Sequence, residues 1–552
     1  MSYGGPPTGA GGAGGIGGIA RVREDPNAKW KILFAALFGI FMILLDTTVV
    51  NVALRTLQRE FGANVNDIQW IVSLYVMATG IATPLSGYLG DRFGQKRVFL
   101  SAIALFAFGS ILCGISPTLT TLIAARCLQG IGGGLALPLG TAQLYSAFPP
   151  EERGQAFGVF GIALVVAPAL GPILGGALVD SGYWRAIFFL NVPIGALGLF
   201  LGSRWLRGGR PNRPVRFDPL GLAASTIGFG SLLFAASVAS SRGWGAPSVI
   251  AGFVIGAIGL IAFAVIELFI APEPLLNLRL FGNRVFALAA ITGYVSTVAL
   301  FGAEFVLPLY LQILRGRSAL EAGVLLLPIA LSSAVASPIA GRLYDRIGPR
   351  PLLVVGFSLL AVNTWQLAQL TANTDLRFVQ VLLALRGLAL GLTIQTTLTT
   401  GLSTVPGPQT ARGSALINST RQVIQSIAVA VLATVLATAV PTALNAQAQS
   451  FGDRAPQTQT GGTDSTGGRF ELCAAGPPGL PSQAQPTVRA FCDDYIHGLG
   501  NTYRVTFYAA LLAIVLGMAM PGWPAPWSGR QSLAGGAAPP RARPQEAVST
   551  GD

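Results

Sequence analysis

Two polar residues interrupt an apolar stretch near the start of the sequence. The segment MILLDTTVVNVAL, residues 42–54, contains Asp46 and, five positions later, Asn51. A carboxylate in hydrocarbon is unfavourable, so an acid in such a place usually pairs with another charge, lines a water-filled path or relays protons. Asp46 is therefore a candidate for reversible proton binding.

An arginine in another apolar stretch is predicted to reach the same depth. If a first span runs outward from about residue 31, Asp46 lies about 22 Å along it, and an inward span from about residue 119 places Arg126 about 10 Å below the outer surface. Both side chains then fall in the outer half of a hydrocarbon core about 30 Å thick. Burial favours the neutral form of an acid and a nearby arginine favours the charged form, so an acid that pairs in only one conformation can bind and release a proton in each cycle. A structural pair that pins two helices together is the alternative.

The sequence contains an internal repeat. The segment GYLGDRFGQKR (87–97) returns as GRLYDRIGPRP (341–351), which sets Asp91 and Asp345 254 residues apart. Parallel repeats with a site at their interface are an architecture of membrane transporters. We therefore expect two six-helix halves related by this repeat.

The charged pair recurs at nearly the same offset. Glu304 follows Asp46 by 258 residues, and Arg386 follows Arg126 by 260. The same depth argument places Glu304 beside Arg386 in the second half. Glu304 is thus a second candidate for proton coupling, with a structural role as the alternative.

The composition indicates a polytopic membrane protein. Of 552 residues, 52% are hydrophobic and 11% are charged, whereas soluble domains carry about 25% charged residues. The net charge of +13 is explained by basic cytoplasmic loops, and we expect no nucleic-acid binding. The single histidine, His497, excludes a His-based triad, and no Cys/His cluster or G-x-x-x-x-G-K-[ST] phosphate loop occurs. We expect no enzyme activity, no metal and no cofactor.

Fourteen apolar stretches are long enough to cross a bilayer as helices. They begin near residues 31, 68, 98, 119, 154, 186, 218, 247, 285, 320, 351, 377, 412 and 504. The arginines and lysines are concentrated in alternate loops, which places both termini in the cytoplasm. The predicted fold class is an all-α integral membrane protein of two six-helix halves with two extra central spans.

These spans divide the chain into segments. We predict a disordered cytoplasmic N-terminus (1–29), a first six-helix half (30–210), the extra pair (211–275), a second six-helix half (276–525) and a disordered cytoplasmic tail (526–552). The second half is interrupted by an external loop (441–503).

Several segments resemble the major facilitator superfamily, and specifically its fourteen-span drug:proton antiporters. GYLGDRFGQKR is similar to the superfamily's motif between the second and third spans, and LDTTVVNVAL to the antiporters' first-span motif, although Arg55 stands where a proline is usual. LIAARCLQGIGGG and APALGPILGG (167–176) resemble their fourth- and fifth-span motifs. YWRAIFFLNVPIG (183–195) and LPLYLQILRGRSALEAGVLLLP (307–328) are similar to segments of the fourteen-span branch. The resemblance covers about residues 31–440 and the last span, and implies the major facilitator fold.

The resemblance implies roles for two further groups of residues. Acids beside several arginines suit an inner gate held by charge, formed by Asp91, Arg92, Asp345 and Arg346. Prolines and glycines in the fifth span suit a kink that rocks against its neighbours, formed by Pro168, Gly171, Pro172 and Gly175. A topology signal with a tight turn and ordinary small-residue packing are the alternatives.

Polar and aromatic residues within the spans are candidates for lining a permissive apolar cavity. They are Asn51, Trp70, Tyr75, Gln129, Tyr310, Gln312, Gln395, Asn418, Arg421 and Gln422. For any one of them, a hydrogen bond between packed helices is the simpler role.

The resemblance implies a proton-driven exporter of lipophilic, often cationic drugs that works by alternating access. Its partners would be such small molecules, protons and the lipid bilayer, and we expect a monomer in a bacterial cytoplasmic membrane. One alternative is export of a specific metabolite, lipid or siderophore. A membrane receptor or passive channel is the non-transport alternative.

The four cysteines separate into two pairs. Cys113 and Cys127 lie in apolar spans and are expected to pack as small hydrophobic residues. Cys473 and Cys492 lie 19 positions apart in the predicted external loop, where disulfides persist. We predict one disulfide between them, worth about 3 kcal/mol by chain entropy, with two free thiols as the alternative.

Overall fold

The computed structural model describes residues 27–206, 208, 216–315, 317, 319–439 and 485–521, and every regular element in these ranges is a helix. The first half comprises α1 (Ala28–Glu60), α2 (Val65–Ala82), α3 (Leu85–Phe93), α4 (Gln95–Ile115), α5 (Leu119–Ala147), α6 (Arg153–Asp180), α7 (Ala186–Phe189) and α8 (Asn191–Trp205). The extra pair is α9 (Pro219–Arg242) and α10 (Pro247–Val265). The second half comprises α11 (Arg284–Leu309), α12 (Ala319–Ile347), α13 (Pro349–Leu367), α14 (Leu376–Ser403), α15 (Thr410–Ala439) and α17 (Gln485–Ala519). Short helical turns are η1 (Pro150–Glu152), η2 (Ile266–Ile270), η3 (Leu278–Gly282), η4 (Tyr310–Leu314) and η5 (Gly407–Gln409).

Each predicted span coincides with one helix or with two consecutive ones. Within the described residues, eleven helices are long and apolar enough to cross a membrane, and a twelfth is the pair α2 and α3, bent by 51°. The bend lies at Pro84, which has no N–H to continue the helix. The all-helical fold is confirmed, whereas the number of fourteen crossings stays a prediction.

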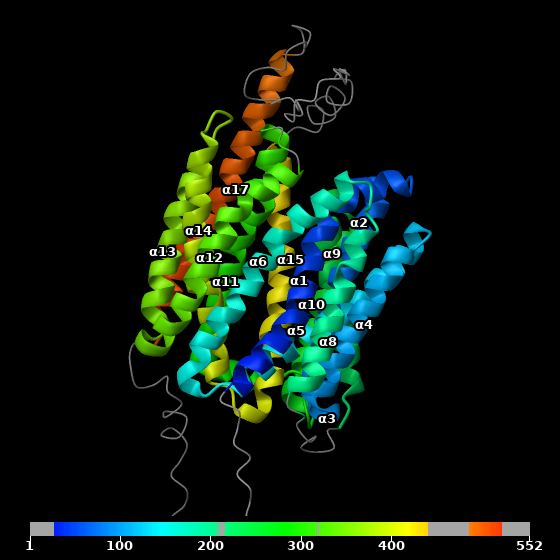
Figure 1. Cartoon of the computed structure of the whole chain (residues 1–552), viewed down its shortest axis with the longest axis vertical. Helices are drawn as coiled ribbons and strands as arrows, with labels where there is room; N and C mark the ends of the chain where they lie inside the picture. The colour runs from blue at the N-terminus through cyan, green and yellow to red at the C-terminus, as the bar shows by residue number, and fades with distance from the viewer. Residues whose placement is uncertain are drawn as a thin grey trace, which may run out of the picture.

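The two halves meet along α6 and α15. In the first half, α1 packs on α6 and α8, while α5 packs on α2 and α4; in the second, α14 packs on α11, α12 and α13. Figure 1 shows the second half on one side of α6 and α15 and the first half on the other. The principal contacts between the halves are α6 with α12 and α14, and α15 with α3 and α5.

Glycines let α6 and α12 touch backbone to backbone. A Cβ on Gly154 would meet the carbonyl oxygen of Gly341, and a Cβ on Gly341 would meet that of Gly154. One turn further along, a Cβ on Gly158 would lie 3.0 Å from the Cα of Pro338. Small residues at such crossings allow close helix packing in membranes.

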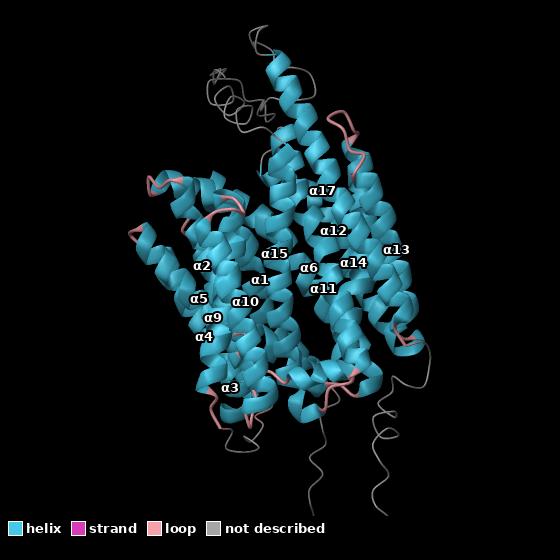
Figure 2. Cartoon of the chain, turned by 180° about the vertical axis from the view of Figure 1, so that it is seen from behind, coloured by secondary structure: helices cyan, strands magenta, loops and turns pink. Residues whose placement is uncertain are grey.

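The extra pair is central in the sequence but peripheral in the fold. α9 packs on α2, α10 and α15, and α10 contacts α9 and the short turn η2. On the outer face of α10, Ile258 and Ile261 are 62% and 65% exposed. These exposed side chains suit contact with lipid. Because α9 packs on both α2 and α15, the extra pair flanks the junction of these two helices (Figure 2).

The described chain begins and ends at one end of the bundle, which we call the termini end. Lys29 of α1 pairs with Glu152 of η1, and the neighbouring Gly154 bonds to α12 through Asp345. Arg350, at the start of α13, donates to the carbonyl oxygen of Met520 at 2.7 Å. A chain that enters and leaves at the same end crosses the bundle an even number of times, in agreement with the predicted topology.

The last helix begins earlier than predicted. We expected an external loop over 441–503, but α17 starts at Gln485, so residues 485–503 are helical and do not form a loop. Their place outside the cytoplasm stays a prediction. Phe491, Tyr495 and Leu499 are buried on one face of this extension and pack on the second half. Apolar residues at helical spacing among polar ones explain why a search for long apolar runs missed the extension.

The predicted disulfide is only partly visible. Cys492 is buried on α17 and is disulfide-bonded, while Cys473 lies outside the described residues. The pairing of these two residues stays a prediction. Cys113 and Cys127 are free.

Candidate functional site

The structure brings Asp46 and Arg126 together. Asp46, at mid-length of α1, accepts a hydrogen bond on Oδ2 from Nη1 of Arg126 on α5 at 2.5 Å. Both residues are 1% exposed. A buried ion pair needs further hydrogen bonds to offset the desolvation of its two charges.

Two amides complete the shell around Asp46. Asn191 Nδ2 donates to Asp46 Oδ1 at 2.7 Å and Gln129 Nε2 donates to it at 3.3 Å. The Oε1 atom of Gln129 accepts from Arg126 Nη1 at 2.9 Å and from the Cys113 thiol at 3.3 Å. The carboxylate is thus fully surrounded by donors in this conformation.

Arg126 contacts residues of α1, α2 and its own helix α5. Its Nε donates to the carbonyl oxygen of Ile71 on α2 at 3.4 Å, and its guanidinium lies 4.2 Å from the centroid of the Tyr75 ring. The contacts described for Asp46 and Arg126 all come from the first half. Protonation of Asp46 would leave a buried arginine without its counter-ion, so a change in its charge must be accompanied by rearrangement inside this half.

Asn191 was missed by the sequence analysis. It is the first residue of α8, and its amide also donates to Ser110 Oγ of α4 at 3.0 Å. The available signal was an amide within the apolar run FFLNVPIG. At membrane depth, a buried amide needs polar partners, and the acid on α1 supplies one.

We expect Asn191→Leu to lower the thermal stability of the protein, because the buried Asp46 Oδ1 then loses its shortest hydrogen bond. A hydrogen bond to a charged group contributes roughly 1.5–3 kcal/mol, and the free energy of unfolding should fall by about this amount. The measurement is the thermal unfolding of the purified variants. Thr292→Val removes a buried hydroxyl that donates to the carbonyl oxygen of Leu288 on its own helix, and it should unfold closer to the native temperature. An unchanged unfolding temperature in Asn191→Leu contradicts the role of Asn191 in the shell.

The counterpart arginine binds helix carbonyls. Arg386 Nη2 donates to the carbonyl oxygens of Ala299 and Leu300 on α11 at 3.1 and 2.9 Å, and its Nη1 lies 3.4 Å from Asn363 Oδ1. The side chain of Glu304, one turn further along α11, lies outside the part of the structure described at side-chain level. Its predicted pairing with Arg386 stays a prediction.

At the termini end, Asp91 bridges the two halves. Its Oδ2 accepts from Nε of Arg412, near the start of α15, at 2.7 Å. Arg92 instead donates to the Tyr88 hydroxyl on its own helix. Arg92 was predicted for the gate, whereas Arg412 was not, because no spacing in the sequence connects Arg412 with Asp91.

Asp345 makes the equivalent bridge in the opposite direction. Its two carboxylate oxygens accept from the backbone N–H groups of Gly154 and Gln155 at 2.8 and 2.9 Å. A carboxylate at a helix N-terminus is favoured by the helix dipole and by the free N–H groups. Arg346 is exposed.

The repeat is also visible in the backbone beside these acids. Gly94 and Gly348 have φ values of 92° and 73°, a left-handed region that favours glycine. They hold equivalent places in the two repeated segments. Each half thus presents an acid, followed by a tight glycine turn, to the other half at the termini end.

The segment predicted as a kink lies where α6 packs on α1. α6 continues through Pro168 and Pro172 as one helix. A Cβ on Gly171 or Gly175 would lie 3.1 Å from backbone atoms of Val49 on α1. The segment therefore packs closely against the helix that carries Asp46.

Comparison with protein families agrees with this arrangement. The model of the Major Facilitator Superfamily matches residues 36–429. The chain belongs to the major facilitator superfamily. The members of this superfamily are transporters.

Several relatives in the superfamily cover most of the chain. The uncharacterized MFS-type transporter YhcA of Bacillus subtilis is 37% identical over 75% of this chain and 78% of its own length. The multidrug resistance protein B homolog of Mycobacterium tuberculosis is 32% identical over 86% of each chain. The lincomycin resistance protein LmrB of Bacillus subtilis is 30% identical over 73% of this chain and 85% of its own.

Solved structures support the superfamily fold. The human organic anion transporter MFSD10 (TETRAN) matches with a TM-score of 0.57 and 15% identity, over 88% of this chain and 100% of its own. The proton:xylose symporter XylE matches with a TM-score of 0.54 and 15% identity, over 90% and 96%. At this identity the likeness shows the fold alone.

The predicted substrate residues fall into different settings within the superfamily fold. Tyr75 and Gln129 belong to the Asp46 network. Trp70 stacks on Phe234 of the extra pair, with ring centroids 6.0 Å apart. Tyr310 is buried in the second half, where its hydroxyl donates to the carbonyl oxygen of Thr371 at 2.9 Å. Asn51 and Gln312 are exposed.

Three of the candidates, all on α15, lie at the interface of the superfamily halves. Arg421 Nη2 lies 3.3 Å from Asn418 Oδ1, and Asn418 donates to the carbonyl oxygen of Ser414 at 2.8 Å. The Ser414 hydroxyl meets that of Thr141 on α5 at 2.5 Å, which joins the halves. Gln422 packs near Gly80 of α2. The substrate role of these residues stays a prediction.

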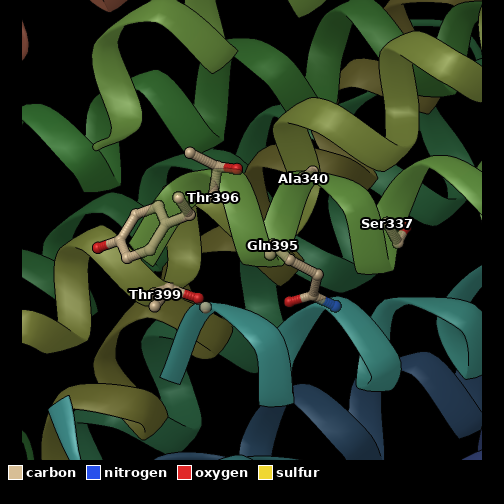
Figure 3. A pocket seen from close by; sticks show the side chains of 8 residues that line it. Ser337, Ala340, Gln395, Thr396 and Thr399 are labelled. Atoms are coloured by element: carbon tan, nitrogen blue, oxygen red, sulfur yellow. The ribbon is translucent and has the colours of Figure 1, made fainter. Parts of the chain in front are cut away.

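A small cavity lies between α6, α12 and α14 near the termini end. Its volume is about 10 Å³, about the room needed for one water molecule and far below the roughly 300–1,000 Å³ of a ligand pocket. Figure 3 shows the amide of Gln395 aimed at α6, and its oxygen and nitrogen have no hydrogen-bond partner. The packing between the halves is therefore tight at this level.

Proposed function

We propose that this chain is a proton-driven exporter of lipophilic, often cationic compounds, which exchanges them for protons across a bacterial cytoplasmic membrane. The observation that supports it best is the fully buried Asp46–Arg126 pair with its amide shell. The names of two relatives, which refer to multidrug and lincomycin resistance, support a drug-like substrate class.

The proposed coupling rests on the competition between a proton and Arg126 for the carboxylate of Asp46. In the closed shell its negative charge is stabilised by Arg126 and Asn191. Protonation of Asp46 removes the electrostatic attraction that holds Arg126 beside it. Because α6 packs closely on both α1 and α12, a movement of α1 is transmitted to the interface with α12. An acid whose charge decides between two packings couples protons to alternating access.

The termini end is proposed to face the cytoplasm. Basic residues of the described chain gather there, in keeping with the positive-inside rule; they include Lys29, Lys31, Lys96, Arg97, Arg153, Arg204, Arg342 and Arg350. The bridges of Asp91 and Asp345 then hold the cytoplasmic side closed. This conformation is the one from which an exporter releases its substrate outward.

The decisive experiment is an efflux assay over a panel of lipophilic cations, neutral drugs and anions in a host that lacks its own pumps. Each compound is measured with and without a protonophore. We expect at least one lipophilic compound to be exported and its export to stop when the proton gradient collapses. Export that continues without the gradient, or loss of a compound only down its own gradient, would contradict proton-driven antiport and favour a passive pathway.

Neutralising the inner gate should slow turnover more than it weakens binding. Asp91→Asn removes the charge that holds Arg412 across the interface, so the closed state is populated less and the cycle slows several-fold. The readouts are the maximal transport rate and the equilibrium binding of substrate to purified protein.

The exchange Asp91→Arg with Arg412→Asp tests the same contact by restoring the pair with reversed charges. Partial recovery of the transport rate is expected. Weaker binding with unchanged turnover in Asp91→Asn would place Asp91 near the substrate and contradict the gate.

A further inference from the structure

Two buried carboxyl groups lie at the termini end of the extra pair. Asp218, the N-cap of α9, is 8% exposed, and Glu267, in the turn η2 after α10, is 1% exposed. Asp218 Oδ1 accepts from the Gly221 N–H at 2.8 Å, and Glu267 Oε1 accepts from the Leu275 N–H at 3.1 Å. The second oxygen of each group, Asp218 Oδ2 and Glu267 Oε2, is buried without a hydrogen-bond partner.

The two carboxyl groups lie on either side of Gly221. A Cβ added to this glycine would touch Asp218 Oδ2 and would lie 3.1 Å from Glu267 Oε1. The groups are therefore close neighbours in a space too small for any side chain at residue 221. Two carboxylates this close and this deeply buried cannot both ionise without a large electrostatic penalty.

Among the described residues, the surrounding charges do not neutralise a second negative charge at this place. The described charged side chains nearest to the pair are Arg412 of α15, Asp91 of α3, the exposed Arg216, and Glu273 and Arg279 of the connection to α11. Arg412 acts on Glu267, but its charge is already balanced by Asp91. Arg279 is exposed and donates to the carbonyl oxygen of Leu268 at 3.0 Å.

We propose that Asp218 and Glu267 hold one proton between them, as a carboxyl–carboxylate pair that forms a second titratable site outside the two superfamily halves. A proton on one carboxyl group would be donated towards the unpartnered oxygen of the other. This arrangement satisfies both buried oxygens and leaves a single negative charge.

The segments around the pair reach the gate. Phe217, next to Asp218, packs on Tyr88 of α3 with ring centroids 5.4 Å apart. Asn277 donates to Gln409 Oε1, beside the start of α15, at 2.8 Å. The pair thus sits behind α3 and α15, which are the two elements that the Asp91–Arg412 bridge joins.

The position of the pair behind α3 and α15 predicts that separation of these helices releases the shared proton. This step rests on the proposed transport cycle. When α3 and α15 separate, Arg412 loses Asp91 and its charge becomes available to the pair. A cation nearby favours the doubly ionised pair, so the proton leaves on the cytoplasmic side. The pair therefore takes up its proton as the gate closes.

Infrared spectroscopy of the full-length protein in lipid bilayers over a pH series tests the shared proton. The carbonyl stretch of a protonated carboxyl group is separate from the carboxylate bands, and subtracting the spectrum of Asp218→Asn/Glu267→Gln isolates the pair. We expect one protonated group at neutral pH. As the pH rises, the band should be lost at a lower pH in Asp218→Asn than in the native protein, because Glu267 then no longer faces the negative charge of Asp218. If the double variant does not fold, the native protein and each single variant are compared directly by the pH at which the protonated band is lost.

The gate link has its own matched pair of variants. Asp91→Asn frees Arg412, so the band of the pair should be lost at a lower pH than in the native protein. Glu60→Gln, which removes an exposed acid paired with Arg185, should not move it. No protonated band at neutral pH, two protonated groups, or a band that appears only after bound cations are removed would overturn the shared proton. An unmoved band in Asp91→Asn would overturn the link. The spectra need neither substrate nor gradient, so they are independent of the outcome of the efflux assay.

Discussion

Asp46→Asn is expected to abolish transport against a substrate gradient while the protein still folds and inserts. The amide has the shape of the carboxyl group but cannot exchange a proton. Arg126 loses its counter-ion, which lowers stability, but it keeps its contacts with Gln129, the Ile71 carbonyl and the Tyr75 ring. The protein should therefore still fold and insert, and the loss of coupled transport should exceed the loss of stability.

Two assays in vesicles separate these effects. Uptake driven by an imposed proton gradient should be lost, whereas exchange of labelled for unlabelled substrate without a gradient should persist. Glu60→Gln is the matched control, because Glu60 forms an exposed pair with Arg185 at 3.5 Å, and such pairs contribute little. Gradient-driven uptake at the normal rate in Asp46→Asn would remove Asp46 from the coupling mechanism.

Arg126→Ala is expected to produce the largest loss of stability. The substitution leaves Asp46 buried without its cation, and breaking a buried pair in this way costs about 3–5 kcal/mol. It also empties the space over the Tyr75 ring. Arg126→Lys should be milder because it keeps the charge, although it loses the bond to the Ile71 carbonyl and the planar contact with the ring.

Thermal unfolding of the purified variants provides the measurement. The double variant Asp46→Asn/Arg126→Ala should be more stable than Arg126→Ala alone, because it removes the uncompensated carboxylate. Arg185→Ala, at an exposed arginine, should unfold close to the native temperature. Additive effects of the two substitutions would show that the pair does not stabilise the fold.

The repeat and the pairing of Asp46 with Arg126 could be predicted because they follow from the number of residues between positions in the sequence. The offset of 254 residues between Asp91 and Asp345 also relates Gly94 to Gly348, whose turns share a positive φ. Depth along a straight helix follows from 1.5 Å per residue. These quantities need no knowledge of which helices pack together.

Other features depend on tertiary packing and were out of reach. Nothing in the order of helices indicates that α9 and α10 lie outside the junction of α2 and α15. The direction of a side chain around its helix decides that Tyr310 is buried in the second half while Arg421 lies at the interface. Asn191 and Arg412 are each far in sequence from the acid that they bind, so their roles appear only once the helices are placed.

The position of α17 has a consequence for the order in which the protein is made. Ala510 and Ala513 of this helix pack on Leu353 and Phe357 of α13, and Arg350 is fixed by the carbonyl of Met520. The ribosome synthesises these partners more than 100 residues after α13. During that interval the second half has an uncovered face, so a chain that terminates early should remain open to chaperones and proteases however well its first half is folded.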